Sequence, residues 1–230
     1  MLGESCELVS HVVLDGHTTI GAGSRISSFA CIGIPPQDLK YKNEPTRVVI
    51  GAKTDIREYV TISRGTVGGG GITSVGSGCL IMAYTHIGHD SSIGNGCILA
   101  NAATLAGHVT VEDYAVVGAL CPVHQFCRIG RYAYIGGGTT ITQDVMPYTL
   151  TSIARDNHAY GLNKVGLERR GFTPEQLKEL RQAYRTLTGS KMNVSQALAE
   201  LRAKIEAGGV GEHVQYLVDF VAKSERGVIR

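Results

Sequence analysis

The stretch VGSGCLIMAYTHIGHDSSIGNGCIL, Val75 to Leu99, places an aliphatic residue at every sixth position. The same step continues through twelve successive positions: Val75, Ile81, Ile87, Ile93, Leu99, Leu105, Val111, Val117, Val123, Ile129, Ile135 and Ile141. A second run with this spacing extends from Leu2 to Ile32, and a third from Ile50 to Ile62. Only 43% of the residues are hydrophobic, so chance does not explain the pattern. The chain is built on a hexapeptide repeat.

A period of six fits neither an α-helix, with 3.6 residues per turn, nor a plain alternating strand. It fits short strands that each direct one aliphatic side chain inward and are joined by tight turns. Glycine suits such turns, and the chain has 30 glycines in 230 residues, against a usual frequency of ~7%. Three strands close a triangular coil, and each coil rises by one strand spacing of about 4.8 Å. The repeat predicts a mainly β protein, a parallel β-helix.

The repeat loses its phase twice. The first gap, from Ile32 to Ile50, matches the length of one coil, but Asp38 and Glu44 occupy the aliphatic positions. The second gap, from Ile62 to Val75, is one residue longer than two hexads, which indicates an insertion. We therefore expect loops at about 34–47 and 63–74. Excursions from a regular solenoid often carry function, although a harmless insertion is the alternative.

The repeat ends near Pro147, and the pattern then changes. We expect a β-helix over 1–147, an irregular connection over 148–172 and a small helical domain over 173–230. Thr173, Pro174 and Gln176 form an N-cap, a first-turn proline and a capping box for the first helix. Further helices are predicted at about 194–206 and 212–223 from their apolar periodicity.

Composition excludes several classes of protein. The net charge of +2 argues against extensive nucleic-acid binding. No run of 18 apolar residues predicts a membrane span, and the first thirty residues do not resemble a secretion signal. We interpret the six cysteines as reduced hydrophobic residues of a cytoplasmic protein.

Histidines converge on one predicted edge of the solenoid. Residues 18 apart should lie above one another, and His89 is followed by His108 and His124, each one residue out of step. His86 lies around the same corner, and Asp90 could orient the imidazole of His89. The residues could also be ordinary turn formers, stacked ladder residues or ligands of an open zinc site, although no cysteine spacing supports zinc.

Several motifs resemble one known family, that of the UDP-N-acetylglucosamine O-acyltransferases. They are QDLKY (37–41), EPTRV (44–48), TISRGT (61–66), THIGHD (85–90), LANAATLAGHV (99–109), VHQF (123–126), DNHA (156–159), GLERRGF (166–172) and the terminal RGVIR (226–230). The resemblance covers essentially the whole chain. It implies a left-handed β-helix and a homotrimer with active sites between subunits. It also implies transfer of an R-3-hydroxyacyl chain from the phosphopantetheine of acyl carrier protein to the 3-hydroxyl of UDP-N-acetylglucosamine, in lipid A biosynthesis. No metal, bound cofactor or covalent acyl-enzyme is implied.

The resemblance also assigns roles. His89 would be the general base with Asp90 as its partner, and the backbone N–H of Gly107 would meet the oxyanion. Gly137 would leave the acyl groove open for a chain of about fourteen carbons. The expected substrate contacts are Asp38, Lys40, His86, His108, His124 and Gln125, with Asn163, Arg169 and Arg170 at the nucleotide diphosphate or the phosphopantetheine.

The chain departs from the family in two places. Its first residues are already in hexad phase, whereas family members usually carry one or two more N-terminal coils, so we expect an N-terminally short solenoid with an uncapped first coil. Val165 stands where the family often has an acidic residue. N-acylation of a 3-amino analogue of the sugar nucleotide, a trimeric β-helix zinc enzyme and a non-catalytic solenoid remain alternatives.

Overall fold

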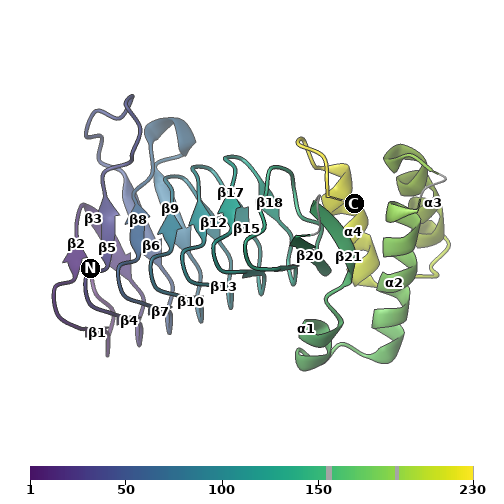
Figure 1. Ribbon diagram of the computed structural model, residues 1–230, viewed down its shortest axis with the longest axis horizontal. Coiled ribbons are helices and arrows are strands. Elements are labelled where there is room, and N and C mark those ends of the chain that lie inside the picture. Colours follow the sequence, from purple (N-terminus) through teal and green to yellow (C-terminus); the bar gives the residue numbers. More distant parts are fainter. Residues whose placement is uncertain (154–156, 190–191, 230) are drawn as a thin grey trace.

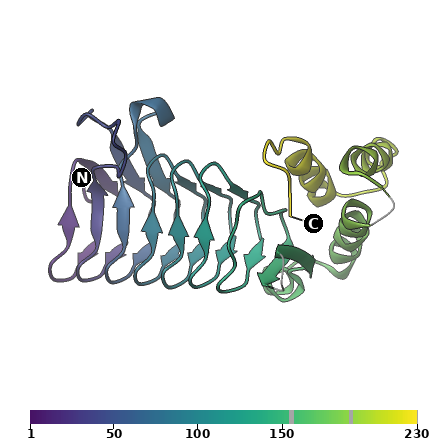
Figure 2. The same ribbon diagram turned by 45° about the horizontal axis from the view of Figure 1, so that its top comes forward.

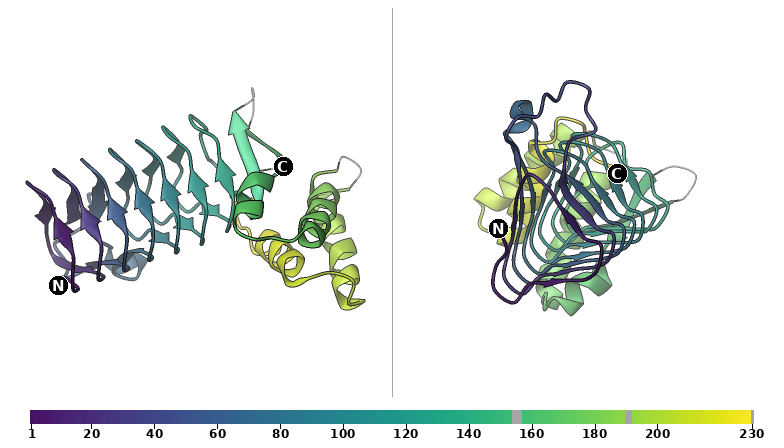
Figure 3. Two further views of the ribbon diagram at one scale, coloured as in Figure 1. Left: turned by 90° about the horizontal axis from the view of Figure 1, so that it is seen from below. Right: turned by 90° about the vertical axis from the view of Figure 1, so that its left-hand side faces the viewer.

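The computed structural model describes residues 1–153, 157–189 and 192–229, and Figure 1 shows a long solenoid followed by a cluster of helices. Asp156 of the DNHA motif and Arg230 of the terminal RGVIR lie outside the described residues. Seen along its axis in Figure 3, the solenoid is triangular.

Three sheets form the sides of the prism, and their strands are parallel except for the last strand of the first sheet. Sheet 1 contains β1 (Glu7–Leu8), β4 (Arg25–Ile26), β7 (Asp55–Ile56), β10 (Leu80–Ile81), β13 (Ile98–Leu99), β16 (Val116–Val117), β19 (Tyr134–Ile135), β20 (Thr149–Ile153) and β21 (Asn157–Leu162). Sheet 2 contains β2 (Val13–Leu14), β5 (Cys31–Ile34), β8 (Thr61–Ser63), β11 (His86–Ile87), β14 (Thr104–Leu105) and β17 (Pro122–Val123). Sheet 3 contains β3 (His17–Ile20), β6 (Arg47–Ile50), β9 (Ile72–Val75), β12 (Ser92–Ile93), β15 (Thr110–Val111) and β18 (Arg128–Ile129).

The strand pairing confirms the coil of eighteen residues. Ile81 pairs with Leu99, and Leu99 pairs with Val117. All twelve hexad residues from Val75 to Ile141 point inward and are at most 3% exposed. The hexad residues Leu2 and Leu8 lie at the N-terminal end of the stack and are 47% and 39% exposed. All six cysteines are free, and four of them are buried in this core.

Both insertions leave the same edge of the prism, the turn that leads from sheet 2 to sheet 3. His17 pairs with Arg47, thirty residues later, so the first insertion adds twelve residues to one coil. Arg47 pairs with Ile72, twenty-five residues later, so the second adds seven and includes a 3-10 helix, η1 (Val67–Gly69). The insertions occupy residues 35–46 and 64–71, where loops were expected at about 34–47 and 63–74. In Figure 3 both loops project from one corner.

The segment 148–172 is regular, contrary to the prediction of an irregular connection. β20 continues sheet 1 by pairing Leu150 with Tyr134, and β21 pairs with it in antiparallel orientation. Helix α1 (Lys164–Arg169) follows, with the Asn163 side chain accepting a hydrogen bond from the Gly166 N–H. These strands were missed because they extend an existing sheet edge and do not need a hexad pattern.

The helical domain packs at the C-terminal end of the solenoid, as Figure 2 shows from a second direction. Its helices are α2 (Pro174–Thr188), α3 (Val194–Glu206) and α4 (Glu212–Ala222). At the junction the Arg131 guanidinium lies 3.4 Å from the ring centre of Tyr216 and donates a 2.7 Å hydrogen bond to the Tyr148 hydroxyl. In the described part of the chain, no helix combines the length and apolar character needed to cross a lipid bilayer.

The end of the chain returns to close the solenoid core. Ile229 is 4% exposed and belongs to the same apolar cluster as Ile141 and Val145. Asp144, which is 1% exposed, holds this return: its carboxylate accepts hydrogen bonds of 2.7 Å from the Arg128 N–H and 2.8 Å from the Ser224 hydroxyl. Asp144 therefore ties the last coil to the C-terminal segment.

Replacing Asp144 by alanine should lower the free energy of unfolding by about 2–4 kcal/mol, because two donors would lose a charged acceptor. Ser224→Ala removes only one of these bonds and should cost about 1 kcal/mol. Urea unfolding followed by circular dichroism measures both variants. Equal effects of the two substitutions would contradict the role given to the carboxylate.

Candidate active site

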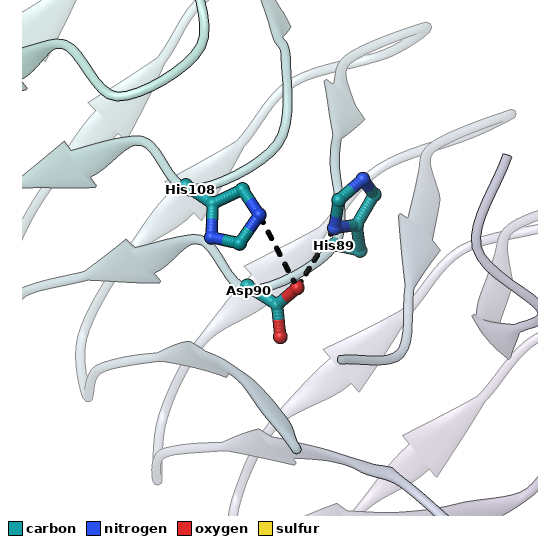
Figure 4. Close-up of side chains that lie close together, drawn as sticks. All are labelled: His89, Asp90 and His108. Atoms are coloured by element: carbon teal, nitrogen blue, oxygen red, sulfur yellow. Dashed lines mark hydrogen bonds and ion pairs between the residues drawn. The ribbon is translucent and has the colours of Figure 1, made fainter. Parts of the chain in front are cut away.

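The turns from sheet 2 to sheet 3 gather the chemically active side chains. This turn carries the two inserted loops in early coils, then His89 and Asp90 between β11 and β12, and then His108 between β14 and β15. Residues far apart in sequence thus meet because each coil places its turn above the last one. Figure 4 shows His89, Asp90 and His108 converging there.

His89 and Asp90 form a tight pair. The His89 Nδ1 atom lies 2.8 Å from the Asp90 Oδ2 atom, and the carboxylate is completely buried while the imidazole is 19% exposed. Asp90 also accepts hydrogen bonds of 2.7 Å from the Thr66 N–H and 2.6 Å from the Thr66 hydroxyl. With the carboxylate accepting, His89 donates through Nδ1, and its Nε2 lone pair is left to accept a proton.

His108 joins this pair, and His124 does not. The His108 Nε2 atom lies 3.7 Å from Asp90 Oδ2, and its ring meets the His89 ring edge-on at 5.1 Å. The ring stacked on His108, at 4.5 Å, is Phe126. His124 lies at the same edge, but its Nδ1 donates to the Gln125 carbonyl at 3.0 Å. In place of the expected column of three imidazoles, the structure has two imidazoles and a phenyl ring. The reason is that the residue one full coil of eighteen residues after His108 is Phe126.

His86 lies on the adjoining strand β11, where its Nδ1 atom is 2.7 Å from the Thr61 hydroxyl. Burial lowers the pKa of His86, and the neighbouring His89 lowers it further. The neutral form of His86 is therefore favoured near pH 7. It can act as a hydrogen-bonding residue beside the His89–Asp90 pair without adding a competing positive charge.

Gly107 lies directly against the His89 ring. A Cβ atom at this position would be only 2.7 Å from His89 Cε1 and 2.8 Å from His89 Nε2. Among the described residues, the Gly107 N–H has no acceptor. The missing side chain thus makes room for the imidazole, and the same residue keeps a backbone N–H without an acceptor.

A cavity of about 470 Å³ opens beside His108 and is walled by both inserted loops. It brings together two expected substrate contacts, Asp38 and Lys40, with His108. Its other lining residues are Tyr41, Glu44, Thr66, Val67, Gly68 and Phe126. Sequence reasoning missed Thr66 and Phe126, although counting 18 residues from His108 would have found Phe126.

The remaining expected contacts lie elsewhere in the chain. Asn163, Arg169 and Arg170 line a larger cavity of about 800 Å³ beside sheet 1, where the Arg170 guanidinium lies 4.2 Å from the ring centre of Tyr114. Gly137 lies just after β19, at the turn that follows sheet 1. A single chain therefore does not bring these residues to His89.

A metal ion is chemically possible at the same place. His89, Asp90 and His108 each offer a ligand atom, and these atoms lie within 4.8 Å of one another. Both Asp90 oxygens, however, already accept hydrogen bonds from Thr66, so a metal would have to compete with them. The expectation that the site works without metal remains a prediction.

Comparison with known proteins identifies the chain. The family described as UDP N-acetylglucosamine O-acyltransferase, domain 2, matches residues 144–229, and the bacterial transferase hexapeptide (six repeats) matches residues 72–107. A curated relative from Burkholderia lata, acyl-[acyl-carrier-protein]–UDP-N-acetylglucosamine O-acyltransferase, is 45% identical over 214 residues, which are 92% of this chain and 80% of the relative. The chain belongs to the UDP-N-acetylglucosamine O-acyltransferase family.

Solved structures of this family agree. LpxA from Acinetobacter baumannii is 39% identical with a TM-score of 0.93, covering 100% of this chain and 88% of that one. The Arabidopsis UDP-N-acetylglucosamine acyltransferase is 37% identical with a TM-score of 0.89, covering 100% of this chain and 83% of that one. The predicted left-handed β-helix with a small C-terminal helical part is confirmed.

Gly107→Ala tests the crowding at this candidate site. The added methyl group should push the His89 ring aside and lower acyltransferase activity at least about tenfold, because proton transfer requires close geometry. Gly209→Ala is the control, since its Cβ would approach no atom closer than 3.7 Å. A crystal structure of Gly107→Ala with His89 unmoved, or full activity, would contradict this account.

Proposed function

We propose that the chain transfers an R-3-hydroxyacyl group from acyl carrier protein to the 3-hydroxyl of UDP-N-acetylglucosamine by general-base catalysis. The family supports the reaction. The observation that carries the mechanism is the His89 imidazole, which hydrogen bonds through Nδ1 to the buried Asp90 and has its Nε2 edge against Gly107.

In this mechanism, His89 Nε2 removes the proton of the sugar hydroxyl as its oxygen attacks the thioester carbonyl. The carbonyl oxygen becomes an oxyanion, and the Gly107 N–H donates a hydrogen bond to it. Asp90 stabilises the imidazolium. When the carbon–sulfur bond breaks, the imidazolium returns its proton to the phosphopantetheine sulfur. The acyl group thus passes directly to the sugar, and no covalent acyl-enzyme or metal takes part.

The binding residues divide into two groups. Asp38, Lys40 and His108 would hold the sugar in the 470 Å³ cavity that they line. His86, on β11, and His124 and Gln125, after β17, would supply further contacts. Asn163, Arg169 and Arg170 would contact the diphosphate or the phosphopantetheine, for which the arginine fork is suited. Because the two groups lie apart in one chain, we propose a homotrimer in which a neighbouring subunit supplies the second group.

The cellular setting follows from the same reaction. A 3-O-acylated UDP-N-acetylglucosamine is a precursor for lipid A biosynthesis, and its acyl donor is carried on acyl carrier protein. The required partners are therefore this carrier and the nucleotide sugar, with no further cofactor. A cytoplasmic location stays a prediction, consistent with free, unpaired cysteines.

His89→Ala should lower kcat by at least two to three orders of magnitude, about what loss of a general base costs. The assay combines UDP-N-acetylglucosamine with 3-hydroxyacyl carrier protein and measures the acylated sugar. His17→Ala is the control, because His17 is exposed on β3. Parallel assays with a 3-amino sugar nucleotide and with a metal chelator test the two enzymatic alternatives; preference for the amine or inactivation by the chelator would overturn the proposal.

Gly137→Met should shift the enzyme toward shorter acyl donors. A Cβ at Gly137 would lie 3.3 Å from the Ala119 carbonyl oxygen, so a side chain can be accommodated with a small adjustment. In the proposed role, this side chain would shorten the groove that receives the acyl chain. Relative kcat/KM values for donors of about ten to sixteen carbons measure the effect. An unchanged order of preference would rule out a role for Gly137 in chain length.

A further inference from the structure

The second inserted loop is fastened to the carboxylate behind the general base. Thr66, the N-cap of η1, donates to both oxygens of Asp90, through its N–H to Oδ1 at 2.7 Å and through its hydroxyl to Oδ2 at 2.6 Å. These two residues are 24 positions apart, and the loop brings them together.

The direction of the hydroxyl hydrogen bond is fixed by its neighbours. Thr66 Oγ1 accepts a 3.2 Å hydrogen bond from the Gly69 N–H as the N-cap of η1, so its own proton is free for Asp90. Asp90 Oδ2 then accepts from both the Thr66 hydroxyl and His89 Nδ1. The Gly69 N–H thus donates to the Thr66 hydroxyl, and the Thr66 hydroxyl donates to Asp90 Oδ2. Because Oδ2 accepts from His89 as well, the proton of His89 must lie on Nδ1.

Packing supports the same arrangement. Gly69 lies so close to Asp90 that a Cβ there would be 2.0 Å from the carboxyl carbon. The Asp90 side chain has no exposed surface. The Asp90 N–H also donates to the Thr73 hydroxyl at 2.8 Å, from the strand that follows the loop. The turn 66–69 therefore covers the carboxylate and excludes water from it.

We propose that Thr66 is a positioning residue for acyl transfer, which holds Asp90 in place and through it sets the orientation and tautomer of the His89 imidazole. Thr66 need not touch the reacting atoms to do so. The expected effect on kcat rests on the proposed function, whereas the expected effect on the orientation and tautomer of His89 does not.

The kinetic test compares Thr66→Val, which removes the hydroxyl at nearly constant shape, with Thr66→Ser, which keeps it. Valine should lower kcat roughly ten- to a hundredfold with KM for the nucleotide sugar changed less than about threefold, and serine should restore most of the activity. Thr54→Val is the matched control: the Thr54 hydroxyl donates to Gly76 at 2.8 Å in a buried turn away from the site. Valine at 66 with wild-type kcat, or serine as damaging as valine, would overturn the proposal.

A second measurement does not depend on turnover. The proton on His89 Nδ1 should give a downfield proton NMR resonance, assigned by its loss in His89→Gln. Thr66→Val should shift or broaden this resonance, and Thr54→Val should leave it unchanged; an unaffected resonance in Thr66→Val would refute the positioning role. Absence of turnover in the wild-type protein would instead refute the proposed function.

Discussion

Everything in this molecule depends on the hydrogen-bonded stacking of successive coils. Parallel pairing fixes each strand one spacing above the last, and the inward aliphatic residues keep all three sheets in phase. A shift of one residue in the strand register would point the aliphatic side chains of that strand outward and its polar ones inward. The stack therefore converts sequence separation into position: residues eighteen apart become neighbours, and a turn repeated in every coil becomes a continuous edge. Such an edge is stiff, which suits the proposed role of His89, because a general base must be held within a fraction of an ångström of its target.

Insertions add what a regular stack lacks. A plain solenoid has flat sides and gives a substrate little to enter. The loops at 35–46 and 64–71 rise from the same edge that carries His89 and His108 in later coils, and they turn that edge into the wall of a cavity. Because β6 and β9 rejoin the ladder on either side, the insertions do not disturb the core. The length of the chain thus varies only in a turn, where no strand pairing has to be kept.

The sequence alone predicts the structure wherever a regular residue pattern determines it. The hexads predicted the parallel solenoid, and the caps at Thr173 predicted the first helix of the C-terminal domain. The contact between His89 and Asp90 could be anticipated because the residues are adjacent. What was missed depends on non-local packing. β20 and β21 are strands because an open edge of sheet 1 recruits them, and the contact of Thr66 with Asp90 depends on where a loop of irregular length returns. The hexapeptide period carries no information on where such a loop returns, so it could not predict the contact.

The buried carboxylate links the fold to the chemistry. A fully buried Asp90 would be costly without donors, since removing a carboxylate from water must be offset by hydrogen bonds or charge. Thr66 supplies two of these donors, and His89 supplies the third. The burial that makes the carboxylate costly also makes it effective, because its attraction to an imidazolium is weakened little by water. The inserted loop therefore supports the proposed mechanism energetically. Without its donors, Asp90 would be buried with one donor, and His89 would lose a fixed partner for its Nδ1 proton.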